Sequence, residues 1–395
     1  MKTETSCKFA ASATMGLESV VRDECAALGF ADIVTVNGRV EFSGDLSLIP
    51  RANINLRCAD RVYVKMGEFT ALSFEELFQE IKRLPWENFI DIDGAFPVSW
   101  VSSVKSKLFS KSDIQKIVKK AMVERLKAHY HKEIFPETGA NYAIRIQANK
   151  DVFVVLLDTS GEPLHRRGYR KLINEAPLKE TMAAALVLLS RWNGDTPFLD
   201  PMCGTGTIAI EAALIARHIA PGAERRFASE KWRCIPQEYW VNARDQAYSA
   251  EDRDKILDIR ASDMDGTVLK VAQENAKRAG VHDDIRWDTM DFAKISPGKP
   301  YGVLITNPPY GDRLLDREKA ADLYRSLGKV CRTEIPRWSC YVITSDEDFE
   351  QNFGKKATKN RKLYNGGIKC YYYQYYGEKP GRSDPAAGKE SVHEK

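Results

Sequence analysis

The hydrophobic pattern at the start of the chain predicts a small α+β unit. Asn37-Gly38 stands between two alternating segments and is the strongest short hairpin signal. The order strand–helix–strand–strand–helix–strand indicates a ferredoxin-like unit over residues 1–67. The predicted elements are a strand at 8–13, a helix at 17–28, strands at 34–36 and 39–42, a helix at 46–56 and a strand at 61–66.

A second α+β unit is predicted over residues 68–160. Ser73 and Ser112 each begin a capping box, in which Glu or Gln follows three residues later, and both therefore predict helix starts. The predicted elements are a helix at 73–84, a strand at 96–101, a helix from 112 onward and strands at 142–148 and 152–157.

From about residue 176 strands and helices alternate, which predicts an α/β domain with a mostly parallel sheet. A Trp- and Arg-rich insertion at 221–254 interrupts the alternation. The predicted elements are a helix at 176–192, a strand ending at 199, a helix at 208–219, a strand at 256–261, a helix at 268–280, strands at 285–287 and 302–306, and last strands at 341–345, 361–364 and 368–376.

The chain has 395 residues, 43% of them hydrophobic, and can bury a core large enough for two or three domains. We expect domains at 1–67, 68–160 and 161–377, followed by a polar, disordered tail at 378–395. No apolar run is long enough to cross a bilayer, and the first residues lack the apolar core of a signal peptide. We therefore expect a cytoplasmic protein with no membrane partner.

The charge and the cysteine content exclude few classes of partner or site. The formal net charge of +4 permits a nucleic-acid partner without arguing for one. The eight cysteines are scattered singly with no C-x-x-C pair, so we expect reduced thiols and no metal site.

A glycine-rich turn follows the strand that ends at Leu199. Gly204 and Gly206 let the backbone approach a ligand, and the helix that follows points free N–H groups at it. The same turn also fits the G-x-G-x-x-A fingerprint of NAD-binding proteins. Taken alone, the turn does not decide what is bound.

Acidic residues follow the next two predicted strands. Asp263 stands at the tip of the second strand, where a carboxylate can accept hydrogen bonds from the two ribose hydroxyls of an adenosine-containing cofactor. Asp291 follows the third strand and could reach an adenine amino group. Each residue alone is better explained as a cap or turn residue. Ligands of open α/β sheets bind at this edge, however, and the signals occur there in order.

The most specific signal is Asn307-Pro308-Pro309-Tyr310, directly after the fourth strand. The prolines fix the backbone and remove N–H donors, so a carbonyl there is free to accept. The Asn oxygen and a proline carbonyl can together hold the two hydrogens of an exocyclic NH2, while the Tyr ring stacks on the base. Methyl transfer from a sulfonium asks for alignment and proximity, not for a strong base, a metal or a covalent intermediate.

The helix predicted from Ser112 carries a basic face. Between residues 101 and 135 nine Lys or Arg stand against three Asp or Glu, and Lys116, Lys119 and Lys120 lie mostly off the apolar stripe. A solvated surface explains an isolated basic helix. Beside a catalytic domain, contact with nucleic-acid phosphates is an equally good explanation.

Together these motifs resemble the class I S-adenosylmethionine-dependent methyltransferases that methylate amino groups. The segments LHRRGYR and APLKETMAAAL, with the N-terminal units, are similar to the THUMP-containing RNA guanine methyltransferases. The bacterial large-subunit rRNA guanine 2-amino methyltransferases resemble the chain most. The similarity runs to about residue 377. The segments that carry it in the catalytic domain are DPMCGTGTIAIEAA, Asp263-Met264-Asp265, Asp291-Phe292 and TNPPYGDRL.

The resemblance implies a Rossmann-like class I methyltransferase domain with a mostly parallel seven-stranded sheet, preceded by ferredoxin-like and THUMP units. It implies S-adenosylmethionine as cofactor and 23S rRNA, or a ribosomal precursor particle, as partner. The implied cofactor residues are Asp200, Cys203, Gly204, Gly206, Thr207, Asp263, Met264, Asp291 and Asn307. The implied catalytic residues are Asn307, Pro308, Pro309 and Tyr310. The implied RNA contacts are Arg166, Arg167 and Arg170. The basic residues Lys116, Lys119, Lys120 and Arg313 are further candidate RNA contacts, although pairing of an exposed Arg313 with Asp312 or Asp316 explains that residue equally well.

The chain departs from the family pattern in two small ways. Cys203 precedes the first glycine of the turn, and we interpret it as a small packing residue because nothing nearby offers a base. The spacing from Gly206 to Asp263 exceeds the roughly 20 residues usual for such motifs, and the insertion at 221–254 accounts for the excess.

Other functions stay open at this point. The enzyme could methylate guanine in tRNA, or the adenine 6-amino group in DNA, since both bases offer an exocyclic amine. The chain could also be a non-catalytic RNA-binding ribosome assembly factor with a degenerate methyltransferase fold. A dehydrogenase is disfavoured because no proton donor and no second dinucleotide feature is evident.

Overall fold

The computed structural model describes residues 6–170, 178–296, 298–309 and 317–378. The chain forms two compact units, and the division between them does not follow the chain order. The first unit holds the chain up to Ala13, then Val21–Leu164 and Pro221–Ser249. The second holds Thr14–Val20, His165–Ala220 and the chain from Ala250 onward.

The first unit is built on one seven-stranded sheet of order β2-β3-β1-β4-β7-β6-β5. Its strands are β1 (Cys7–Ala13), β2 (Ala31–Val36), β3 (Arg39–Gly44), β4 (Ala59–Thr70), β5 (Val98–Val104), β6 (Ile144–Asn149) and β7 (Val152–Asp158). The twelve-residue β4 pairs with β1 on one side and β7 on the other. The two α+β units expected from the sequence therefore share a single sheet.

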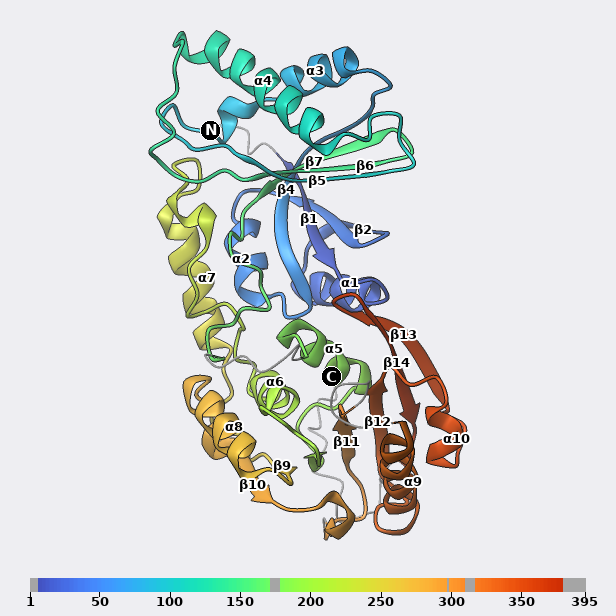
Figure 1. Ribbon diagram of the computed structural model, residues 1–395. Helices are drawn as coiled ribbons and strands as arrows, with labels where there is room; N and C mark the ends of the chain where they lie inside the picture. The colour runs from blue at the N-terminus through green and yellow to red at the C-terminus, as the bar shows by residue number, and fades with distance from the viewer. Residues whose placement is uncertain (1–5, 171–177, 297, 310–316, 379–395) are drawn as a thin grey trace, which may run out of the picture. The chain divides into compact units, whose positions relative to one another are not determined.

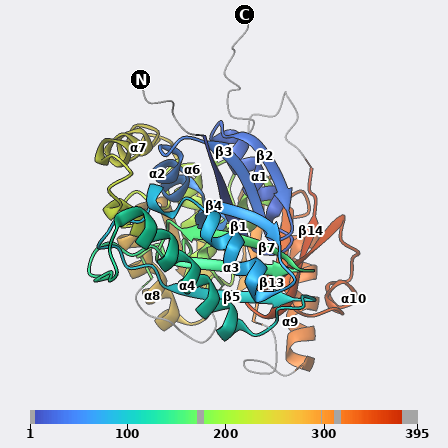
Figure 2. The same cartoon turned by 90° about the horizontal axis from the view of Figure 1, so that it is seen from above.

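Helices of the first unit begin and end largely where local signals place them. They are α1 (Glu18–Ala27, which belongs to the first unit from Val21 onward), α2 (Leu48–Asn55), α3 (Phe74–Arg83), α4 (Lys111–Tyr130) and α7 (Gln237–Ser249), with single turns at Trp86–Asn88 and Ala228–Lys231. Ser73 caps α3, as its capping box predicts. The cap of α4 is Ser110 and not Ser112, because Ser110 stands three residues before Asp113 and accepts its N–H. Figure 2 shows α3 and α4 side by side.

The predicted insertion packs on the first unit. Helix α7 contacts α2, and the Gly222 N–H donates to the Ile54 carbonyl at 2.9 Å. A Cβ on Gly222 would lie 2.6 Å from the Asn53 carbonyl oxygen, so the approach requires glycine. The Trp232 ring stacks on Tyr142 with centroids 4.9 Å apart. Residues 221–249 thus add to the first unit although the second unit flanks them in sequence.

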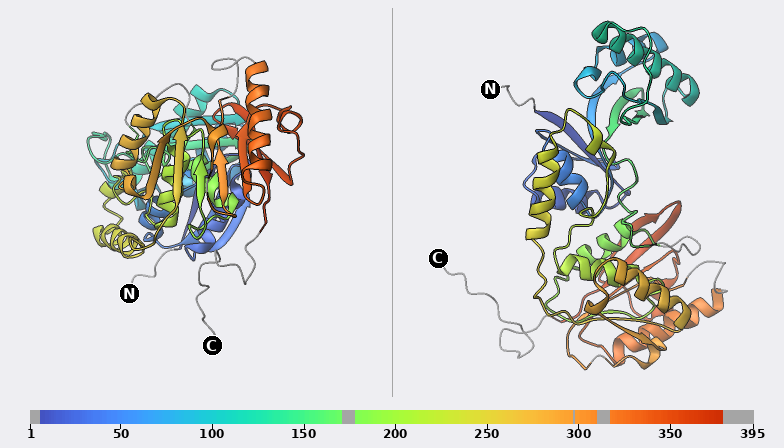
Figure 3. Two further views of the ribbon diagram at one scale, coloured as in Figure 1. Left: turned by 90° about the horizontal axis from the view of Figure 1, so that it is seen from below. Right: turned by 90° about the vertical axis from the view of Figure 1, so that its left-hand side faces the viewer.

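The second unit is a seven-stranded sheet of order β10-β9-β8-β11-β12-β14-β13, with helices packed around it (Figures 1 and 3). The strands are β8 (Phe198–Asp200), β9 (Ile259–Asp263), β10 (Ile285–Thr289), β11 (Val303–Thr306), β12 (Ser339–Thr344), β13 (Lys359–Asn365) and β14 (Ile368–Tyr375). Strands β8 to β12 pair in parallel, and β14 alone runs opposite to them, so its pairings with β12 and β13 are antiparallel. The mostly parallel α/β prediction is confirmed.

Two helices of the second unit begin within two residues of their predicted starts at 208 and 268, and the last two were not predicted from the sequence. The helices are α5 (Glu180–Ser190), α6 (Thr207–Ala216), α8 (Gly266–Arg278), α9 (Arg317–Thr333) and α10 (Phe349–Phe353), with single turns at His282–Asp284 and Phe292–Lys294. The predicted start of the first of them, at 176, and the predicted disordered tail beyond 378 lie outside the described residues. None of the helices in the described ranges is long and apolar enough to cross a membrane.

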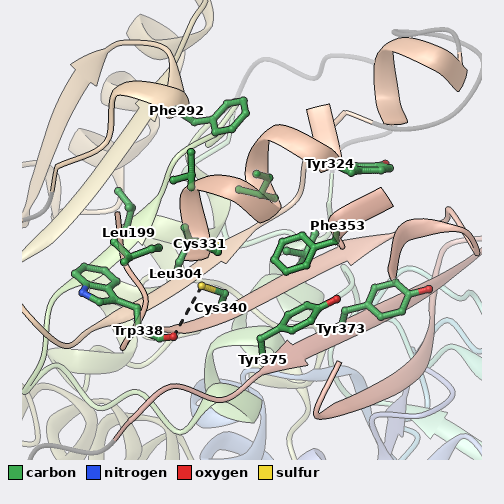
Figure 4. Close-up of a cluster of buried hydrophobic side chains, with 14 of the residues drawn as sticks. Leu199, Phe292, Leu304, Tyr324, Cys331, Trp338, Cys340, Phe353, Tyr373 and Tyr375 are labelled. Carbon is green, nitrogen blue, oxygen red and sulfur yellow. Dashed lines mark hydrogen bonds between the residues drawn. The ribbon is translucent and has the colours of Figure 1, made fainter. Parts of the chain in front are cut away.

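A buried aromatic cluster fills one side of the second sheet (Figure 4). The Phe353 ring stacks on Tyr375 with centroids 4.4 Å apart, and Leu304 of β11 is fully buried in the same cluster. The Tyr373 and Tyr375 hydroxyls donate to backbone carbonyls, which allows tyrosines in the core. The cluster anchors β11, the strand that leads into the candidate base site.

Candidate cofactor and base site

The candidate site lies at the carboxyl ends of the parallel strands of the second unit. From β8 the chain runs to β9 and β10 on one side, while β11 lies on the other side of β8. Strand order reverses at β8, and in open α/β sheets ligands bind at such a switch point. In register, Asp200 faces Ala261 and Thr289 faces Asp263, so the strand ends form one edge.

The two glycines of the turn have different local surroundings. Gly204 (φ 53°) and Gly206 (φ 81°) both adopt the left-handed conformation that favours glycine. A Cβ on Gly206 would lie 3.0 Å from the Ala272 Cβ, whereas a Cβ on Gly204 would meet no atom of the described residues within 4 Å. Gly206 therefore allows close packing at the start of α6, and the described part of the chain leaves the side-chain position of Gly204 open.

The carboxylate of Asp263 fastens the end of β9 to the glycine turn. Its Oδ2 accepts the Gly204 N–H at 2.9 Å, and its Oδ1 accepts the Asp265 N–H at 3.0 Å. Asp265 in turn caps α8 by accepting the N–H groups of Thr267 and Val268. A carboxylate has about four lone-pair sites, so Asp263 retains acceptor capacity for hydroxyl groups.

Asp200, the last residue of β8, is an unusual buried acid. It is 1% exposed, and its Oδ1 has no hydrogen-bond partner within the described part of the chain. Burial, together with a smaller effect of the negative charge of Asp263, raises the pKa of Asp200 to about 8. An orphaned buried acceptor fits a ligand that brings a cationic or N–H donor group, such as the ammonium of a methionine moiety.

Cys203 lies in the turn but is buried. Burial raises the pKa of its thiol well above the usual value, and the carboxylates of Asp200 and Asp263 act in the same direction. The thiol therefore stays protonated, in agreement with its interpretation as a packing residue.

Met264 and Asp291 flank the same edge. Met264 is 70% exposed, a high value for a large apolar side chain that directly follows a buried strand. Asp291 caps the single turn at Phe292–Lys294 through Oδ1, which accepts the Ala293 N–H at 2.9 Å. No hydrogen bond to the other Asp291 oxygen occurs among the described residues, and the adenine role of this residue stays a prediction.

Asn307 follows β11 on the opposite side of β8 from Asp263. Its Oδ1 is buried and has no hydrogen-bond partner within the described ranges, and Pro308 is buried beside it. Pro309 is partly exposed. An unpaired buried acceptor costs stability unless a ligand donor meets it. Tyr310 and Arg313, which complete the predicted base and RNA contacts, lie outside the described residues.

The connector arginines divide into an exposed residue and two interior ones. Arg166 is exposed. Arg167 is buried, with its Nε 3.4 Å from Glu211 of α6. The Arg170 side chain is only 8% exposed and lies 3.7 Å from Glu180. It also donates to the Thr207 hydroxyl at the start of α6 and to the Leu178 carbonyl.

Sequence reasoning missed the two acids that hold these arginines. Glu211 is fully buried in an otherwise apolar helix, and Tyr169 also donates to it at 3.0 Å. A single charged residue inside an apolar helical run was the available signal, because a buried charge needs a partner. The arginines expected to face RNA are thereby connected to the helix that begins at the glycine turn.

The three lysines expected to contact RNA also differ. The Lys116 side chain is 79% exposed, and Lys120 is exposed as well. Lys119 is 2.6 Å from Glu137 and donates to the Phe96 carbonyl, and burial lowers its pKa. Lys116 and Lys120 are therefore accessible to an RNA phosphate, whereas Lys119 already serves the local structure.

Three family models match the chain in the expected order. An RlmL ferredoxin-like domain matches residues 8–63, a THUMP domain matches 71–158, and an RMKL-like methyltransferase domain matches 167–374. The chain belongs to the RMKL-like methyltransferase family. This membership confirms the expected class I methyltransferase fold, the RNA-methyltransferase class and S-adenosylmethionine as cofactor.

Individual relatives agree with the family. The putative RNA methyltransferase YpsC of Bacillus subtilis is 46% identical over 93% of this chain and 95% of its own length. The ribosomal RNA large subunit methyltransferase K/L of Psychromonas ingrahamii is 33% identical over 91% of this chain, which spans about half (49%) of that protein. The crystal structure of SMU.472, a putative methyltransferase complexed with SAH, is 42% identical with a TM-score of 0.89, covering 95% of this chain and all of that one.

Proposed function

We propose that this RMKL-like methyltransferase transfers a methyl group from S-adenosylmethionine to the exocyclic 2-amino group of a guanine in 23S rRNA. The observation that carries the proposal is the buried Oδ1 of Asn307 at the switch point of the sheet, which has no hydrogen-bond partner among the residues that the structure describes. This atom is an acceptor held ready for an N–H donor, and an exocyclic amine supplies one.

The chain's residues would hold the cofactor at three points along the sheet edge. Asp200 accepts from the methionine ammonium, Asp263 from the ribose hydroxyls and Asp291 from the adenine amine. The exposed Met264 packs on the adenine ring. The cofactor supplies an activated sulfonium methyl, so the protein's task is to align the acceptor nitrogen with it.

The target base would be held on the β11 side. Asn307 Oδ1 and the Pro308 carbonyl accept the two amine hydrogens, which directs the nitrogen lone pair toward the methyl group. Tyr310 stacks on the base. The N–CH3 bond would form as the sulfonium S–CH3 bond breaks, which leaves S-adenosylhomocysteine, and the proton that the methylated nitrogen then loses would pass to solvent. Asn307 only accepts a hydrogen bond and does not act as a base.

The 23S rRNA substrate is supported by the 33% identity to the ribosomal RNA large subunit methyltransferase K/L of Psychromonas ingrahamii. The THUMP match supports RNA over DNA. Guanine in tRNA is the second candidate, because the same RNA-binding unit could present either RNA.

Methyl transfer followed by nucleoside analysis tests the proposal. The purified chain is incubated with labelled S-adenosylmethionine and, separately, with 23S rRNA, tRNA and DNA, and the modified nucleoside is identified by mass spectrometry. We expect N2-methylguanosine from 23S rRNA. N2-methylguanosine from tRNA alone would change the substrate, whereas methyladenine from DNA or the absence of transfer to every substrate would overturn the proposal.

A further inference from the structure

The loop between β5 and α4 of the first unit exposes an aromatic side chain among lysines. Phe109 is 78% exposed, and Lys105, Lys107 and Lys111 around it are exposed as well. No Asp or Glu occurs between residues 98 and 112. An isolated exposed apolar residue is ordinary, but here apolar exposure coincides with a local excess of positive charge.

Apolar exposure continues from the loop along β5. Trp100 is 39% exposed and Val104 is 50% exposed. β5 is the last strand of its sheet, so one of its edges pairs with β6 and the other pairs with no strand of that sheet. The Arg145 guanidinium lies 5.6 Å from the Trp100 ring centroid, which adds a cation beside this aromatic. We call this surface, which consists of Trp100, Val104 and residues 105–111, the β5 rim.

Hydrogen bonds hold the loop in this conformation. The Ser103 hydroxyl donates to the Leu108 carbonyl at 2.6 Å, and Leu108 itself is buried. The Lys107 N–H donates to Asp151 Oδ1 at 2.6 Å, and the Asp151 N–H donates to the Ser106 hydroxyl at 2.9 Å. Because the loop is already ordered with Phe109 exposed, ligand binding loses less conformational entropy than it would with a flexible loop.

We propose that the β5 rim binds an unpaired stretch of RNA, with Phe109 stacked on a base and the three lysines beside phosphates. The inference rests on the proposed RNA substrate and extends it. Lysines attract the backbone, and an exposed aromatic ring offers a stacking surface for any base, which is the combination that single-strand binding uses. In a duplex the base faces are already stacked and cannot reach Phe109.

Fluorescence anisotropy with a labelled single-stranded RNA of mixed sequence, and with its duplex, tests this proposal on the full chain. Phe109→Ala should weaken single-strand binding about fivefold or more and leave duplex binding unchanged, because one base loses its stack. Phe109→Trp should retain the affinity. Replacing Lys105, Lys107 and Lys111 together by Gln should reduce the slope of log affinity against log salt by about two.

Matched controls are Ile134→Ala and Lys132→Gln, two exposed positions that follow α4. Wild-type affinity of Phe109→Ala for the single strand overturns the proposal, as does an equal loss in Ile134→Ala or an equal loss for the duplex. Methyl transfer to RNA by the wild type is recorded in parallel. If the wild type methylates RNA and Phe109→Ala binds the single strand as tightly as the wild type, only the proposal for the β5 rim is overturned. If the wild type methylates no RNA, the proposed function itself is overturned.

Discussion

The Asp263 carboxylate accepts the backbone N–H of Gly204 at 2.9 Å, which fixes the end of one strand to the turn that follows its neighbour. The second oxygen of the same carboxylate accepts the Asp265 N–H at 3.0 Å. One side chain therefore shapes the glycine turn and also stands where the ribose is expected. The conformation of the glycine turn and the expected binding of the ribose therefore depend on the same carboxylate.

Asp263→Asn should weaken cofactor binding. An amide can accept one of the two N–H groups but presents its own NH2 to the other, and a hydrogen bond to a charged acceptor is lost. We expect the affinity for S-adenosylhomocysteine, measured by titration calorimetry, to fall roughly tenfold or more. Asp265→Asn is the control, because Asn caps helices as well as Asp does and binding should be retained. Equal affinities of Asp263→Asn and the wild type would contradict the assignment.

Cofactor binding should depend on pH through Asp200. Burial raises the pKa of this carboxyl to about 8, so below that pH it is mostly protonated. A bound ammonium favours the ionised form, and binding below pH 8 should therefore release a proton. The affinity for S-adenosylhomocysteine should rise by up to roughly tenfold per pH unit from pH 6 to 8 and then level off.

Asp200→Asn should remove this pH dependence and weaken binding at pH 8, while the exposed Asp322→Asn should change neither. The folded state keeps a proton on Asp200 between about pH 4 and 8 that the unfolded state has lost. The contribution of this group to stability therefore falls as pH rises through that range, and thermal unfolding of the unliganded protein should show the fall. An unchanged pH profile in Asp200→Asn would refute the role.

Asn307→Ala should slow transfer by roughly a hundredfold or more without abolishing cofactor binding. Loss of the acceptor leaves the target amine unaligned, and misplacement of about 1 Å costs roughly a hundredfold in rate. Single-turnover transfer to the RNA that the wild-type protein methylates measures the effect on rate, and calorimetry with S-adenosylhomocysteine measures cofactor binding. Asn360→Ala, at an exposed position of β13, is the control. A parallel loss of cofactor affinity would mean that Asn307 serves the cofactor and not the base.

Arg170→Gln tests whether Arg170 supports the glycine turn that binds the cofactor or contacts RNA. The Arg170 guanidinium donates to Thr207 and faces Glu180, so its loss should disturb the start of α6. We expect the affinity for S-adenosylhomocysteine to fall roughly tenfold while the affinity for RNA is retained, and we expect Arg170→Lys to recover part of the loss. The exposed Arg166→Gln is the counterpart, with weaker RNA binding and normal cofactor binding. Weaker RNA binding with normal cofactor binding in Arg170→Gln would mean that Arg170 contacts RNA.

The sequence determined the local features because each depends on neighbouring residues. Hydrophobic period distinguished strands from helices, Asn37-Gly38 marked the hairpin, and Ser73 marked a cap. The motif residues Asp200, Asp263 and Asn307 could be named in advance because each stands at the carboxyl end of an apolar strand. Knowledge that such strand ends meet at one edge then predicted the site.

Tertiary structure alone decided the features that depend on contacts between distant segments. Only the fold shows that β4 joins two predicted units into one sheet and that residues 221–249 pack on the first unit. Only burial distinguishes Lys119 and Arg170 from exposed basic residues, because a charge is identical in sequence whether it meets water or a carboxylate. The periodicity of a sequence reports which face is apolar. The partner of that face, and the partner of a charge, are set by the packing of the whole chain.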